Sequence, residues 1–142
     1  MKKRRIGRIY TILFLISAII ILITGCDLYD EEDYPEWNGN RYIKYEVTGS
    51  AVTVDITIEN EDEGTSQFSD VSVPWTYIFP EKKYVDEGDY IFVYVSAQNQ
   101  GETGTVTASI YYKKKKSGDY KQFKSSTSSG AYVIATASGA LE

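Results

Sequence analysis

The sequence predicts an all-β domain, an immunoglobulin-like antiparallel β-sandwich of seven or eight short strands, over residues 41–142. Three observations support this prediction. Apolar and polar residues alternate with a period of two along most of this region, as in strands that bury one face. No segment of it shows the 3.6-residue period of an amphipathic helix. Valine, isoleucine, threonine and tyrosine, which favour strands, are abundant.

The expected strands follow one another with short turns between them. Gly49-Ser50 separates two segments of strict alternation. Pro74 lacks an N–H and predicts an edge strand or a break in the segment around it. Trp75 is expected to fill the core, with an exposed docking residue as the alternative. Tyr90–Ala97 is apolar on both faces, which indicates a central strand. The expected strands are 43–47, 52–58, 71–79, 90–97, 105–110, 120–126 and 131–137, with a polar loop at 127–130.

Residues 1–25 have the pattern of a secretory leader. A basic head is followed by an apolar run, Ile9–Ile23, and by the small residues Thr24 and Gly25. The run is shorter than the ~20 residues of a typical spanning helix, although an uncleaved anchor remains an alternative. Ile23-Thr24-Gly25-Cys26 resembles the lipobox of bacterial lipoproteins, which implies that Cys26 is lipidated and becomes the new N-terminus. The expected location is therefore the cell envelope, lipid-anchored to the extracytoplasmic side of a bacterial membrane.

Residues 26–40 are expected to form an acidic tether after the lipidated Cys26. The segment 27–36 holds six carboxylates and no basic residue, and such a run repels itself and buries no core. Acidic residues at this place resemble surface-export tags of some lipoproteins, whereas an aspartate directly after the cysteine resembles an inner-membrane retention signal. The membrane and leaflet therefore stay open.

Composition narrows the function. The sequence has 15 basic and 20 acidic residues, and five of the basic ones lie in the leader, which leaves ten against twenty and a formal net charge of −10. A nucleic-acid partner is not expected, because such binding needs a basic face. The sequence has no histidine and a single cysteine, so the usual zinc sites and the Ser-His-Asp or Cys-His nucleophiles are excluded. We expect no enzyme activity and no cofactor.

Three segments, taken in order, resemble the MmpS family of mycobacterial membrane proteins. They are Tyr45-Glu46-Val47-Thr48-Gly49-Ser50-Ala51, Val73-Pro74-Trp75 and Val95-Ser96-Ala97-Gln98. The resemblance implies an extracytoplasmic β-sandwich that assists MmpL exporters of the RND type. Family members are held by a transmembrane helix and many carry a cysteine pair in the sandwich, whereas this chain has the lipobox and one cysteine, Cys26.

Three surface features are candidate sites, each with a purely structural alternative. Tyr90, Phe92 and Tyr94 share one strand face, which either packs inside or offers an amphipathic platform for a partner. Lys113, Lys114, Lys115 and Lys116 precede a Ser117-Gly118-Asp119 turn, and either protect a strand edge or meet an acidic partner or anionic head groups. Glu61, Asp62 and Glu63 form a weak candidate calcium site, because their spacing matches no EF-hand loop.

Two function classes remain. The first is a non-catalytic envelope accessory protein that binds a membrane transporter, as the resemblance to MmpS implies, or another envelope partner. The second is a surface module that binds carbohydrate or peptide through the tyrosine face. The membrane is a partner in both cases, through the lipid.

The role of Cys26 can be tested by substitution. Cys26→Ser is expected to leave an unprocessed precursor without lipid label, because lipidation of the thiol precedes cleavage in lipoproteins. Metabolic labelling with a fatty acid and the apparent mass measure both effects. Normal cleavage and labelling of the variant would contradict the assignment.

Overall fold

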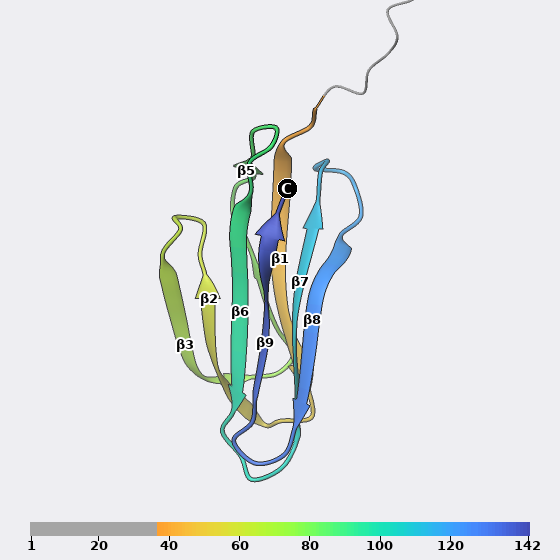
Figure 1. The fold of residues 1–142 in the computed structure, drawn as a ribbon. Helices are drawn as coiled ribbons and strands as arrows, with labels where there is room; N and C mark the ends of the chain where they lie inside the picture. The colour runs from red at the N-terminus through yellow and green to blue at the C-terminus, as the bar shows by residue number, and fades with distance from the viewer. Residues whose placement is uncertain (1–36) are drawn as a thin grey trace, which may run out of the picture. The chain divides into compact units, whose positions relative to one another are not determined.

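The computed structural model describes residues 37–142, which form nine strands and no helix (Figure 1). Consequently, no helix in this range is long and apolar enough to cross a membrane. The predicted leader and Cys26 lie outside the described residues. The strands are β1 (Asn40–Gly49), β2 (Thr53–Glu59), β3 (Thr65–Ser72), β4 (Trp75–Ile78), β5 (Lys83–Tyr84), β6 (Ile91–Asn99), β7 (Thr105–Lys113), β8 (Lys121–Ser129) and β9 (Ile134–Leu141).

The strands form two antiparallel sheets that pack face to face, which confirms the predicted β-sandwich. One sheet has the order β4-β1-β7-β8, with β5 paired to the start of β1. The other has the order β3-β2-β6-β9. The expected number of strands, seven or eight, was too low, because the segment around Pro74 forms two strands and the two-residue strand β5 gave no sequence signal.

The core lies between the two sheets and is built from the predicted alternation. Ile43, Tyr45 and Val47 of β1 point inward, and so do the apolar residues of one parity in β2, β6 and β7. Tyr45 is fully buried, where its hydroxyl accepts a hydrogen bond from the Tyr94 backbone N–H (3.4 Å) and its ring meets Phe79 edge-on. Burial raises the pKa of Tyr45 far above its usual value, because the phenolate would be charged in an apolar interior. Tyr90–Ala97 was predicted to be central, and β6 indeed lies between β2 and β9.

Pro74 marks the place where the chain crosses from one sheet to the other. β3 pairs with β2, whereas β4 pairs with β1, and the Val73–Pro74 peptide bond between them is cis. Both strands are sheet edges, so the break predicted from the proline is confirmed. Trp75 is half-buried rather than fully buried, and it packs against Phe68 (5.1 Å between centroids) and Tyr77 (6.1 Å). These rings join the two edges on that side of the sandwich.

Two turns lie elsewhere than the sequence pattern suggested. β8 continues to Ser129, so the expected loop at 127–130 is displaced to residues 130–133, where Gly130 has a φ of +128°. The end of β8 consists of serine and threonine. Both of its faces are therefore polar, and the apolar–polar alternation that marks a strand is missing there. Val52 was expected to start the second strand on its buried face, together with Val54 and Ile56. It lies instead in the β1–β2 turn and is 83% exposed, because β2 begins at Thr53.

The compact unit begins at Trp37, within the range expected for the tether. Trp37 Nε1 donates to the carbonyl of Val85 (2.9 Å). Arg41 is fully buried at the start of β1, and its guanidinium donates to the carbonyls of Asn38 (2.6 Å) and Glu142 (2.6 Å). These contacts fix the start of β1 against the last residue of the sequence. The acidic residues of 27–36 lie outside the described range, whereas 37–40 belong to the folded unit.

The two ends of the sandwich differ (Figure 1). One end, called the entry end because β1 starts there, holds Trp37, the β7–β8 hairpin and the β2–β3 loop. The far end holds the β1–β2, β6–β7 and β8–β9 turns. Asn99, 0% exposed, ties the far-end turns together, because its Nδ2 donates to the carbonyls of Thr103 (2.9 Å) and Gly130 (2.8 Å) and its Oδ1 accepts from the Gly101 N–H (2.9 Å).

Replacing Asn99 tests this organisation. Asn99→Ala removes three hydrogen bonds and leaves backbone groups of two turns without partners, so unfolding should cost at least about 2 kcal/mol less than in the parent. Urea denaturation measures the difference. The matched control is Gln98→Ala, whose amide makes one exposed 3.5 Å contact to Tyr132 and should change stability by less than about 0.5 kcal/mol. Equal effects of the two substitutions would contradict the role of Asn99.

Candidate binding surfaces

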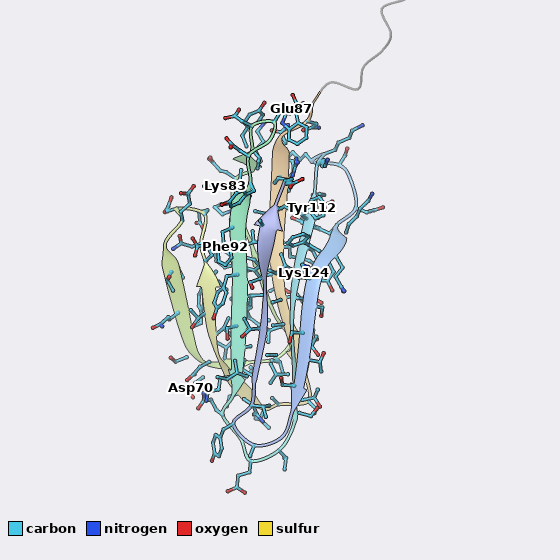
Figure 2. All side chains as sticks on the ribbon, in the orientation of Figure 1. Asp70, Lys83, Glu87, Phe92, Tyr112 and Lys124 are labelled. Carbon is cyan, nitrogen blue, oxygen red and sulfur yellow. The ribbon has the colours of Figure 1, made fainter. Side chains whose placement is uncertain are left out.

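The aromatic residues predicted on one face of β6 lie on the outer face of the sandwich. Phe92 is 53% exposed, Tyr90 just before the strand is 66% exposed, and Tyr94 is half-buried. The rings of Phe92 and Tyr94 are nearly parallel, with centroids 6.5 Å apart and an interplanar angle of 21°. Their partners across β9 are Ala140 and Ser138, whose small side chains leave the rings uncovered. The face is thus an open platform, and Figure 2 shows Phe92 in the upper half of β6.

A cavity of about 300 Å³ adjoins this platform at the entry end. Tyr90 and Phe92 form one wall, and Glu59, Glu63 and Lys83 contribute polar groups. The interior residues Ile43, Phe79 and Ile91 form its floor. The lining therefore mixes apolar side chains with charged groups and the amide of Asn60.

The acidic β2–β3 loop is folded around the side chain of Asn60. Asn60 Oδ1 accepts from the backbone N–H groups of Asp62 (3.1 Å) and Gly64 (2.9 Å). Glu61 accepts a 2.7 Å hydrogen bond from the Tyr77 hydroxyl, and Glu63 lies 3.6 Å from the Lys83 ammonium. The candidate ligands Glu61, Asp62 and Glu63 therefore do not converge. Within residues 37–142, no group of three His, Cys, Asp or Glu is arranged to hold a metal ion.

Hydrogen bonding within the loop shifts two pKa values in opposite directions. The pKa of Glu61 is lowered, first by its backbone hydrogen bond and then by the Tyr77 hydroxyl, because both stabilise the carboxylate. The same contact raises the pKa of Tyr77, since the hydroxyl must keep its proton to donate. Glu61 is thus held in its ionised form at neutral pH.

The four lysines predicted as one patch have different surroundings. Lys113 is half-buried on the outer face of β7, where its Nζ donates to the carbonyl of Lys116 (2.8 Å) and lies 4.6 Å from the centre of the Tyr120 ring. Lys114 lies 5.7 Å from the Trp37 ring. Lys115 and Lys116 are exposed at the hairpin. The hairpin therefore joins the outer face of one sheet to the place where the chain enters the domain.

Sequence reasoning missed a tyrosine–lysine cluster on the outer face of β1 and β7. Lys44 lies 4.2 Å from the Tyr111 ring and donates to Glu46 (2.9 Å). Tyr42 lies opposite Lys113, and Tyr120 lies between the two ammonium groups. Burial raises the pKa of Tyr120. The outward parity of Tyr42 and Lys44 was a signal in the sequence, but the β1–β7 register that unites the cluster was not.

The structure does not bring the platform and the lysines into one surface. Phe92 projects from the outer face of one sheet, whereas Lys113 projects from the outer face of the other. The two candidate surfaces therefore lie on opposite sides of the sandwich and can act independently.

Comparison with known proteins adds no assignment: no known family matches this chain, and no curated protein does.

The Tyr77–Glu61 hydrogen bond predicts a specific pH dependence. Because the folded-state pKa of Glu61 is lowered, its contribution to stability is present above the ordinary value of 4.5 and is lost as pH falls through the lower folded value. Tyr77→Phe removes one of the two hydrogen bonds, so the Glu61 pKa should rise toward 4.5 and less stability should be lost on acidification. Carboxyl NMR titration measures the pKa, and denaturation at about pH 7 and about pH 3 measures the stability.

Tyr84→Phe serves as the control, because Tyr84 is exposed and makes no side-chain hydrogen bond within residues 37–142. It should leave the titration of Glu61 unchanged. An unchanged Glu61 pKa in Tyr77→Phe would show that the hydrogen bond does not stabilise the carboxylate.

Proposed function

We propose that this chain is a lipid-anchored, non-catalytic protein of the bacterial cell envelope that binds an envelope protein through the outer face of β6. The observation that carries the proposal is the exposed Phe92–Tyr94 pair with the neighbouring Tyr90. Large exposed aromatic side chains are costly in water, and they are enriched at protein interfaces, where they supply area with little loss of side-chain entropy. The small residues opposite them on β9 favour access by a partner.

Connectivity supports an anchored role. If Cys26 carries the lipid, ten residues separate it from Trp37, and a fully extended segment of that length spans at most about 40 Å. The start of β1 and the platform on β6 both lie toward the entry end (Figures 1 and 2). The platform would then stand within reach of the part of a membrane protein that projects from the bilayer. The MmpS resemblance makes a transporter of the RND type one candidate partner.

Composition supports binding rather than catalysis. The sequence lacks histidine, and its single cysteine is Cys26. The pKa of Glu61 is shifted toward lower values, so this carboxylate stays ionised at neutral pH and is a poor general acid.

A second candidate function is a surface module for carbohydrate. Phe92 is exposed and Tyr94 is half-buried beside it, and the apolar face of a sugar ring can stack on an aromatic ring of this kind. The adjoining cavity has a carboxylate on each of Glu59 and Glu63, which can accept hydrogen bonds from sugar hydroxyls.

Site-specific photo-crosslinking in cells tests the proposal. A photoreactive residue at position 92 should give a crosslink to one envelope protein, and a transporter of the RND type is the first candidate to probe. The matched control is position 134, because Ile134 is also 53% exposed but lies at the far end of the same sheet. Phe92→Ala should lower partner binding at least about tenfold, as expected for an aromatic residue at the centre of an interface, whereas Ile134→Ala should not.

Two results would contradict the proposal. Equal crosslinking from positions 92 and 134 would show that the platform is not the contact. Saturable binding of an oligosaccharide that is lost in both Phe92→Ala and Tyr94→Ala, without any protein crosslink, would support the carbohydrate module instead.

A further inference from the structure

We propose that the cavity beneath the β7–β8 hairpin binds the phosphate group of a small anionic ligand. This site goes beyond the proposed partner surface and lies on another part of the domain. The cavity has a volume of about 340 Å³, and its walls include Tyr112, Lys113, Lys114, Lys115 and Lys121. Figure 2 labels Tyr112 at the base of the hairpin.

The charge of the cavity is strongly one-sided. Four lysines line it, and Asp119 is the one acidic residue among its lining residues. The ion pairs of residues 37–142 join Lys44 to Glu46 and Lys83 to Glu63, so within that range none of the four cavity lysines has a carboxylate partner. Lys113 Nζ is turned toward the Tyr120 ring on the outer face of β7, whereas Lys114, Lys115 and Lys121 are exposed lysines of the lining. The lining therefore carries an excess of positive charge, which a bound anion would offset.

The hairpin that carries these lysines is held by its own contacts. The Gly118 N–H donates to the carbonyl of Lys115 (3.0 Å), which closes the turn. Lys113 Nζ donates to the carbonyl of Lys116 (2.8 Å), and Asn38 Nδ2 donates to the carbonyl of Lys114 (3.4 Å). The backbone of the hairpin is therefore organised before a ligand arrives, and less entropy is lost on binding.

A second positive group lies next to the site. An adjacent cavity, also of about 340 Å³, shares Tyr112 and Lys114 with the first and is further lined by Trp37 and Glu142. The buried guanidinium of Arg41 lies behind this lining, 5.5 Å from the centre of the Trp37 ring and hydrogen-bonded to the carbonyl of Glu142. Its Nη2 is buried and has no hydrogen-bond partner in the described part of the chain. Arg41 thus adds a buried positive charge behind the adjacent cavity, whose own lining includes the acidic residue Glu142.

The size and charge of the site select the ligand class. A volume near the lower end of the ~300–1,000 Å³ range of ligand pockets suits a phosphate with a small attached group, such as glycerol. Lysine ammonium groups are point charges that can approach a tetrahedral phosphate from several sides. A phosphate ester carries nearly two negative charges at neutral pH, so several ammonium groups attract it more strongly than a singly charged carboxylate. A long polyanion is disfavoured by the acidic remainder of the chain, which has a formal net charge of −10 after the leader.

NMR titration of the mature lipoprotein in neutral detergent micelles tests the proposal. Glycerol phosphate, added at constant ionic strength, should shift the amide resonances of residues 113–121 in a saturable way, and chloride should not. Charge reversal by Lys115→Glu with Lys121→Glu should weaken the affinity at least about tenfold. The control, Lys82→Glu with Lys124→Glu, changes the net charge equally at two exposed lysines outside the cavity and should leave the affinity nearly unchanged.

Two further measurements identify where the phosphate group comes from and test whether the chain's own carboxylates occupy the site. Short-chain phosphatidylglycerol in the micelles is compared with soluble glycerol phosphate, and the tighter of the two ligands reveals whether the site faces a lipid headgroup or a soluble ester. Equal losses in the two charge-reversal variants would overturn the proposal. Binding that appears only after the acidic residues of 27–36 are neutralised would overturn it as well, because the chain's own carboxylates would then be the occupant. The crosslink from position 92 serves as an independent readout in all variants.

Discussion

The structure depends on the burial of two inner sheet faces against each other, without a disulfide within residues 37–142. The strands β1 and β7 on one side and β2 and β6 on the other supply most of the buried side chains. A domain of this size has little apolar area to spare, and the inward positions of these four strands hold mostly apolar side chains. Phe92, Tyr94 and the tyrosine–lysine cluster of β1 and β7 lie on the outer faces, supported by a rigid interior that they do not help to build.

Edge strands limit the same architecture, because their unpaired N–H and C=O groups invite pairing with other chains. β8 has Lys121 and Lys124 on its edge and a bulge at Phe123. β3 is bent at Asp70, whose φ is +55° and whose N–H donates to Asp55 Oδ1 (3.0 Å). Both edges thus carry charge and irregular backbone. The same hairpin that protects β8 also concentrates the lysines that line the cavity, so protection and anion binding can share residues.

The period-two pattern predicted most strands, because a half-buried strand must alternate apolar and polar residues and few other structures do so. It did not predict which strands pair. The exposure of Phe92 depends on Ala140 across the sheet. The adjacent cavity depends on Trp37 lying beside residues of β7, β8 and β9. Neither relation has a signature in one sequence, since register is set by the whole fold. The role of Asn99 was not predicted for a related reason. An amide at the end of an apolar strand is usually a surface residue, and its hydrogen bonds to two turns become visible only in the folded structure.

The position of β1 has a mechanical consequence. The chain enters at Trp37 and runs directly into a strand that is paired on both sides, with β4 and β7. A pull on the chain at Trp37 in the direction of β1 therefore loads the hydrogen bonds of two ladders together, rather than opening them one after another. Arg41 donates a hydrogen bond to the carbonyl of Glu142 at the start of β1. This contact must break before the two ladders can shear. The chain thus enters the domain through a strand that is held by ladders on both sides.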